Sequence, residues 1–142
     1  MSQSDFASLG LNPALVDNLA SLGYAAMTPI QAQALPPILV KKDVIAKAKT
    51  GSGKTATFAL GLLHNLDVKR FRVQTLVLCP TRELADQVAV EIRKIARGIH
   101  NVKVLTLCGG MAFGPQVGSL EHGAHIIVGT PGRVEEHLRK AN

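Results

Sequence analysis

The sequence of 142 residues lacks tryptophan and contains only one tyrosine, four phenylalanines and two cysteines. Cys79 and Cys108 lie in separate apolar runs without Cys-x-x-Cys spacing, which favours two buried thiols in a reducing compartment over a disulfide or a zinc site. His122 and His125 are three residues apart, but no other His or Cys nearby completes a ligand set. The sequence therefore argues against a metal site at these histidines.

The sequence also lacks an apolar run long enough to cross a bilayer, and its polar start, Met1-Ser2-Gln3-Ser4-Asp5, does not form the core of a signal peptide. We therefore expect a soluble, cytoplasmic protein without a membrane partner. Its length suits one compact domain and leaves no room for a second full domain. Sixteen Lys and Arg against ten Asp and Glu give a net charge of +6, which favours polyanionic partners without establishing nucleic-acid binding.

A glycine-rich loop follows an apolar run at residues 43–46, which predicts a buried strand, and precedes a predicted helix at residues 54–66. The loop reads Ala48-Lys49-Thr50-Gly51-Ser52-Gly53-Lys54-Thr55. Its glycines let backbone N–H groups approach phosphate oxygens, Lys54 offers a charge to the β- and γ-phosphates, and Thr55 offers a hydroxyl to Mg²⁺. The positive end of the helix points at the same anion. The pattern predicts a nucleoside triphosphate site with Lys54 and Thr55 as catalytic candidates, and an ordinary strand-to-helix turn is the alternative.

Apolar runs and helical periodicity alternate along the rest of the chain. Strands are expected at residues 75–79, 102–108 and 125–128, and helices are expected to begin near Pro13, Thr28, Thr81, Pro115 and Thr130. This alternation predicts an α/β fold with an open, mainly parallel sheet and right-handed crossovers. The strand at 75–79 is almost wholly apolar, which predicts a sheet covered on both faces. The turns at 48–55, 80–85 and 129–133 should share the carboxyl edge, where function gathers in such sheets.

Several polar residues in these turns have a purely structural explanation. Thr28, Pro29 and Gln31 have the spacing of a capping box, which alone accounts for the glutamine. The Thr130-Pro131 pair repeats the cap and first-turn proline, and Arg82 falls in the first turn of a helix. For these last residues, a helix start and a phosphate contact are equally good explanations.

In order and spacing, these turns resemble the N-terminal RecA-like domain of the DEAD-box RNA helicases, over nearly the whole chain. Residues 23–31 are similar to the Q motif of that family, and Phe6 stands where the family has an isolated upstream aromatic residue. Residues 48–55 resemble its phosphate loop, in which alanine is usual at the first position. The segments 80–85, 109–110 and 130–133 resemble its motifs Ia, GG and Ib. Within the family, residues 78–80 and 107–110 are most similar to the bacterial DbpA branch.

The resemblance implies that the nucleotide is ATP. Gln31 would read the adenine edge and Tyr24 would stack on the ring, while Phe6 and Thr28 complete the motif. Met27 replaces the proline that is usual in the family. The phosphates and Mg²⁺ would be held by the loop residues Ala48, Lys49, Thr50, Gly51, Ser52, Gly53, Lys54 and Thr55.

The resemblance also implies a partner, RNA, held by its phosphates. The implied contacts are Thr81, Arg82, Gly110, Thr130 and Arg133, with Gln116 as a weaker member. Helix N-termini and glycine backbone bind anions without reading bases, so we expect sequence-independent and salt-sensitive binding.

The Asp-Glu-Ala-Asp motif of the family does not occur, and no Asp-Glu pair occurs anywhere in the chain. Attack on the γ-phosphate needs carboxylates to position Mg²⁺ and water, so we expect this chain alone to lack ATP hydrolysis. The resemblance implies a fragment of a longer enzyme that lacks its C-terminal RecA-like domain, and that is completed by another chain, self-associates or rearranges locally. The alternatives are a non-catalytic nucleotide- or RNA-binding module and a metabolic P-loop kinase or other nucleotide hydrolase.

Overall fold

A computed structural model describes residues 5–49, 51 and 53–140 of the chain. Thr50 and Ser52 of the predicted phosphate loop lie outside the described residues. The chain divides into two compact units. The first unit combines Met1–Leu66 with Glu91–His100, and the second combines Asp67–Val90 with Asn101–Asn142.

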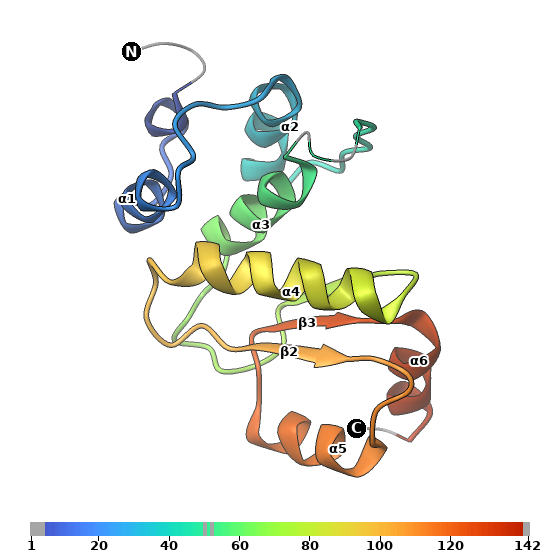
Figure 1. Ribbon diagram of the computed structural model, residues 1–142. Coiled ribbons are helices and arrows are strands. Elements are labelled where there is room, and N and C mark those ends of the chain that lie inside the picture. Colours follow the sequence, from blue (N-terminus) through green and yellow to red (C-terminus); the bar gives the residue numbers. More distant parts are fainter. Residues whose placement is uncertain (1–4, 50, 52, 141–142) are drawn as a thin grey trace. The chain divides into compact units, whose positions relative to one another are not determined.

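Helices and strands alternate through most of the chain (Figure 1). In order, the elements are the 3-10 helix η1 at Phe6–Leu9, α1 at Pro13–Ser21, α2 at Pro29–Leu39, α3 at Lys54–His64, β1 at Thr75–Leu78, α4 at Arg82–Ala96, β2 at Val104–Leu107, α5 at Phe113–His122, β3 at Ile126–Gly129 and α6 at Pro131–Arg139. The predicted helices are confirmed, and so are three of the four predicted strands, with ends that differ by a few residues. In the described part of the chain, no helix is both long and apolar enough to cross a membrane.

In the first unit, side-chain caps and close helix contacts fix the helices. The Oδ1 atom of Asn12 accepts a hydrogen bond of 3.0 Å from the Ala14 N–H and begins α1. The amide of Asn18, further along α1, donates to the carbonyl oxygens of Lys94 and Ile95 at 2.8 and 2.9 Å. These bonds add partners to carbonyl groups in the last turn of α4, where the regular hydrogen bonds of the helix interior end.

The predicted strand at residues 43–46 is wrong, because no strand forms before β1 in the described residues. Ile45 is 93% exposed, and Val44 is 38% exposed. A strand needs a neighbour to receive its backbone hydrogen bonds. The three described strands pair only with one another, so this apolar segment has no neighbouring strand among them.

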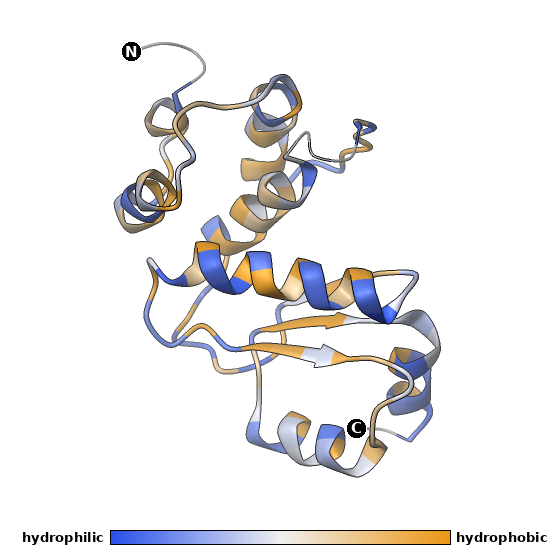
Figure 2. Cartoon of the chain, in the orientation of Figure 1, coloured by the Kyte–Doolittle hydropathy of each residue, from blue (hydrophilic) through white to orange (hydrophobic). Residues whose placement is uncertain are grey.

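The sheet lies in the second unit and has the strand order β1-β3-β2, with parallel pairing throughout. The parallel sheet predicted from the sequence is therefore confirmed. All four residues of the central strand β3 are buried. Ile127 packs with Leu107 of β2 and Val134 of α6, and the partly buried Leu105 and Leu120 join this cluster. Figure 2 shows the resulting apolar character of β2 and β3.

The edge strand β1 departs from the prediction that both faces of the sheet are covered. Its burial alternates, and Leu76 and Leu78 are 48% and 54% exposed. The apolar composition of the strand was therefore not sufficient to show that both of its faces are covered.

Both cysteines of the second unit are buried thiols, as predicted. Burial raises the pKa of the Cys79 thiol. Burial and, secondarily, the Asp86 carboxylate raise the pKa of the Cys108 thiol. Both groups therefore stay protonated at neutral pH and behave as small apolar side chains.

His125 closes the end of the sheet opposite to the predicted site and is fully buried. The Lys103 N–H donates to its Nδ1 at 3.1 Å, so Nε2 carries the proton and donates to the Val68 carbonyl at 2.9 Å. The ring also meets the Phe71 ring edge-on, with centroids 5.0 Å apart. One neutral side chain thus joins three segments of the unit.

We predict that His125→Phe lowers the free energy of unfolding by about 1–3 kcal/mol, because it removes both hydrogen bonds of a fully buried side chain and leaves the partly buried Lys103 N–H and Val68 C=O without this partner. Urea denaturation followed by circular dichroism measures the change. His122→Phe is the matched control, because His122 is exposed on α5 and should change the stability by less than about 0.5 kcal/mol. Equal effects of the two substitutions would contradict this role of His125.

Candidate functional site

The predicted site residues fall into two neighbourhoods, one in each unit, and each is described by itself. The Q-motif and phosphate-loop residues belong to the first unit, whereas the predicted RNA contacts belong to the second.

In the first unit, the Gln31 side chain joins the start of α2 to the start of α3. Its Oε1 atom accepts a hydrogen bond of 2.9 Å from the Thr28 N–H, and its Nε2 atom donates to the Gly53 carbonyl at 3.2 Å. Gln31 is only 1% exposed. A Cβ atom at Gly53 would collide with this amide, and the φ angle of +94° there also requires glycine. Gln31 therefore both caps the start of α2 and contacts the predicted phosphate loop.

The start of α3 has the features of an anion site. Gly53 is its N-cap and brings no side-chain oxygen to the free N–H groups of the first turn, where Lys54 and Thr55 lie. Thr57 hydroxyl donates back to the Gly53 carbonyl at 2.9 Å, which fixes the turn. The Thr28 hydroxyl is buried beside this turn and has no hydrogen-bond partner within the described ranges. The N–H groups suit nucleotide phosphates, and the hydroxyl oxygen of Thr55 suits Mg²⁺.

The aromatic residues of the predicted adenine site also lie together. The rings of Phe6 and Tyr24 meet edge-on, with centroids 6.4 Å apart and an interplanar angle of 89°. The Tyr24 hydroxyl donates to the Glu91 carboxylate. Burial, followed by the effects of Glu91, raises the pKa of Tyr24 to about 12, so the phenol stays neutral. Sequence reasoning missed Glu91, which fixes the Tyr24 hydroxyl and is 67 residues away in the chain.

In the second unit, the register brings the carboxyl ends of the strands level. Gly129 of β3 pairs with both Leu78 of β1 and Leu107 of β2. The turns at 80–85, 109–110 and 129–133 therefore emerge at one edge, as predicted. The shared position of the turn at 48–55, which belongs to the first unit, stays a prediction.

One hydrogen bond joins two of these turns, and a second lies within the turn at 80–85. The Gly109 N–H donates to the Thr130 hydroxyl at 3.1 Å, and the Leu84 N–H donates to the Thr81 hydroxyl at 3.2 Å. The latter bond caps the start of α4. Gly110 has a φ angle of +79°, and a Cβ atom there would lie 3.3 Å from Nη1 of Arg82. The predicted residues of motifs Ia, GG and Ib are thus adjacent, and Thr81 and Thr130 each also have a structural role.

Arg133 and Gln116 are hydrogen-bonded to each other. Nη1 of Arg133 donates to Oε1 of Gln116 at 3.1 Å and to the Met111 carbonyl at 2.8 Å. Nε2 of Gln116 donates to the Cys108 carbonyl at 3.1 Å. Gln116 is 7% exposed, so the structure places it inside the unit, behind Arg133.

His137 is a further member of this group that sequence reasoning missed. Its Nε2 lies 2.9 Å from Oε1 of Gln116, and its ring stacks on Phe113 with centroids 4.2 Å apart. Burial, then the Arg133 charge, lowers the pKa of His137, so the imidazole is neutral at pH 7. The sequence contained a signal for the proximity of His137 to Arg133, because residues 133 and 137 are four apart and lie on one face of a helix.

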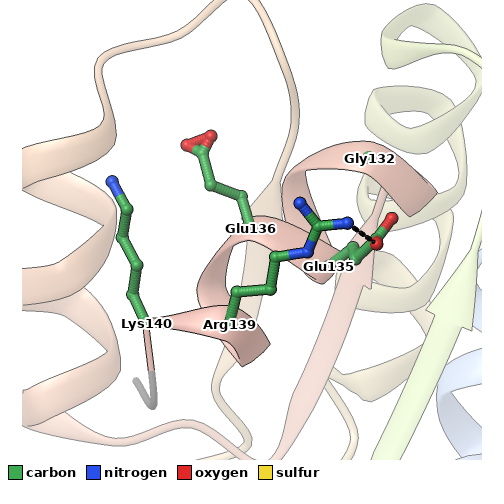
Figure 3. Close-up of a pocket in the computed structure, with 5 residues that line it drawn as sticks. All are labelled: Gly132, Glu135, Glu136, Arg139 and Lys140. Atoms are coloured by element: carbon green, nitrogen blue, oxygen red, sulfur yellow. Dashed lines mark hydrogen bonds and ion pairs between the residues drawn. The ribbon is translucent and has the colours of Figure 1, made fainter.

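An open depression on α6 is lined by Gly132, Glu135, Glu136, Arg139 and Lys140 (Figure 3). The Arg139 guanidinium pairs with the Glu135 carboxylate at 2.5 Å, while Glu136 and Lys140 project away from this pair. The positive and negative groups here neutralise each other, so the depression lacks the net charge of a phosphate site.

Comparison with known proteins identifies the family. The family model for DEAD/DEAH box helicases matches residues 28–142. The ATP-dependent RNA helicase DbpA of Escherichia coli is 62% identical over 130 residues, which cover 92% of this chain and 28% of that relative. The predicted similarity to the DbpA branch is therefore confirmed. The chain spans less than a third of the length of this curated relative.

Two solved structures share the fold. A DEAD box protein from the hyperthermophile Methanococcus jannaschii has a TM-score of 0.91 and 37% identity, over 97% of this chain and 38% of that chain. Saccharomyces cerevisiae Dbp5 bound to RNA and ADP BeF3 has a TM-score of 0.86 and 29% identity, over 99% of this chain and 35% of that chain. These likenesses confirm the RecA-like fold. Because the family model covers most of its length, this chain belongs to the DEAD/DEAH box helicase family.

Proposed function

We propose that this chain is the ATP-binding and RNA-backbone-binding part of an ATP-dependent RNA helicase that unwinds short RNA duplexes. The contact of Gln31 with Gly53 carries the proposal, because it joins an amide suited to an adenine edge to a phosphate loop. The names of the relatives support it, and the yeast relative of similar fold is bound to RNA and a nucleotide. The two buried, protonated thiols support a reducing, cytoplasmic location.

On the nucleotide side, the proposed role of the chain is to bind ATP and to orient it. Gln31 offers a donor and an acceptor to adenine, but both already bond the backbone, so these bonds must be shared or exchanged when ATP binds. The Lys54 ammonium and the α3 N-terminus would hold the phosphates, and Thr55 would hold Mg²⁺. Mg²⁺ neutralises the charge of the phosphates when it is bound.

On the RNA side, positive charge and helix N-termini converge at the carboxyl edge of the sheet. Arg82 is exposed in the first turn of α4, and Gly110 lets backbone approach its guanidinium closely. Arg133 occupies the corresponding first turn of α6. The contacts go to phosphates, so binding is expected to be independent of sequence and sensitive to salt.

The second candidate function is a non-catalytic nucleotide- or RNA-binding module. It is favoured by the lack of an Asp-Glu pair and by the exposed segment at 43–47, which leaves the phosphate loop without a supporting strand among the described residues. For this chain alone we expect binding without turnover. ATP hydrolysis by this chain that increases when RNA is added would exclude the non-catalytic module.

We predict that Gln31→Ala lowers the affinity for ATP by about tenfold or more and reduces the preference for ATP over GTP, because hydrogen bonds to adenine are lost. Fluorescence titration with labelled ATP and GTP measures both effects. Gln33→Ala is the matched control, because Gln33 is exposed on the same helix. If both variants bind ATP equally well, Gln31 does not read the base.

We predict that Arg133→Ala weakens binding to single-stranded RNA of any sequence and reduces the salt slope of log affinity by about 1, because one phosphate contact is lost. Fluorescence anisotropy at several salt concentrations measures the slope. The matched control is Arg139→Ala, since Arg139 lies on the same helix with a 76% exposed side chain. An identical slope in both variants would rule out the phosphate contact of Arg133.

A further inference from the structure

Gln116 is the centre of a buried polar group in the second unit. Nε2 donates to the Cys108 carbonyl, and Oε1 lies within hydrogen-bond distance of both Arg133 Nη1 and His137 Nε2, at 3.1 and 2.9 Å. A carbonyl can only accept and a guanidinium can only donate, so the amide has one possible orientation. Both ends of the amide are therefore engaged within the chain.

The same logic fixes the state of His137. Because Oε1 of Gln116 is an acceptor, Nε2 of the imidazole must carry a proton and donate it. The ring is 3% exposed and lies nearly parallel to Phe113, at an interplanar angle of 16°. A neutral imidazole can make this bond without adding a second positive charge beside Arg133.

These contacts select one edge of the Arg133 guanidinium. Nη1 has two hydrogens, and they are donated to Gln116 and to the Met111 carbonyl. Nη2 has no hydrogen-bond partner among the described residues, and Nε has only the Glu136 carboxylate, 3.7 Å away. Nε and Nη2 form the side edge of a guanidinium, which binds two oxygens of one phosphate at once.

We propose that Gln116 and His137 are positioning residues that hold Nη1 of Arg133 inward and thereby present its Nε–Nη2 edge to an RNA phosphate. The inference rests on the proposed function, because it requires Arg133 to bind phosphate. It assigns to Gln116 an action through Arg133 in place of a direct RNA contact. A guanidinium that is already oriented loses less side-chain entropy when it binds, which strengthens binding without any new contact.

A double-mutant cycle tests whether Gln116 acts through Arg133. Gln116→Met keeps the length of the side chain but removes its hydrogen bonds. The test measures the affinity for a fluorescein-labelled oligouridylate by fluorescence anisotropy. It compares the wild-type chain with Gln116→Met, Arg133→Ala and the double variant. We expect Gln116→Met to weaken binding about threefold to tenfold in the wild-type background and to have no further effect in the Arg133→Ala background.

A second pair of variants tests His137 without altering Gln116. His137→Phe keeps an aromatic ring against Phe113 but cannot donate a hydrogen bond, whereas His137→Gln retains an N–H donor. We expect His137→Phe to weaken RNA binding about threefold and His137→Gln to restore at least part of the affinity. His122→Phe on α5 is the control for the substitution itself, and thermal melting confirms that each variant is folded.

The outcomes separate this inference from the proposed function. If Arg133→Ala leaves RNA affinity unchanged, the RNA contact fails, and the inference fails with it. If Arg133→Ala weakens binding but Gln116→Met weakens it equally in both backgrounds, Gln116 acts elsewhere and only the inference is overturned. If Gln116→Met does not fold, the comparison of His137→Phe with His137→Gln tests the inference. Equal RNA affinities of these two variants would overturn it.

Discussion

The buried amide of Gln31 is the constraint on which the proposed nucleotide site depends. It accepts from the N-cap of α2 and donates to the residue that begins α3, so two helix starts are held by one side chain. Loss of either hydrogen bond of the amide would be destabilising, because a polar group shielded from water would have no partner. The glycine at position 53 follows from the same packing, since a larger residue would displace the amide. The residue proposed to read the base and the predicted phosphate loop are therefore joined by direct contact.

The proposed RNA-binding edge depends on a different constraint, the level ends of three parallel strands. Because Gly129 pairs with residues of both neighbouring strands, the turns that follow them meet at one edge. Backbone and hydroxyl groups link these turns, and the guanidinium of Arg133 is fixed by Gln116 from behind. The proposed phosphate contacts thus lie on one hydrogen-bonded edge and not on independent loops, which suits recognition of a backbone with regular spacing.

The sequence predicts well what is local and poorly what depends on distant partners. Helix starts such as Asn12 and Thr28 are found because caps act within a few residues. The strand at 43–46 is wrong because apolar composition does not reveal whether a neighbouring strand exists. The family resemblance identified Arg133 as an expected RNA contact. The pairing of Gln116 on α5 with His137 on α6 joins residues that are 21 positions apart, and no local pattern predicts it. Only the folded chain shows which polar residues contact one another across such separations.

Amide hydrogen exchange with and without a nucleotide tests the central claim most directly, because it locates the bound nucleotide along the backbone. If Gln31 and the phosphate loop act as one unit, an ATP analogue with Mg²⁺ should slow exchange in residues 28–32 and 53–57 together, and a GTP analogue should do so less. Protection of the loop alone, or equal protection by both nucleotides, would contradict the account.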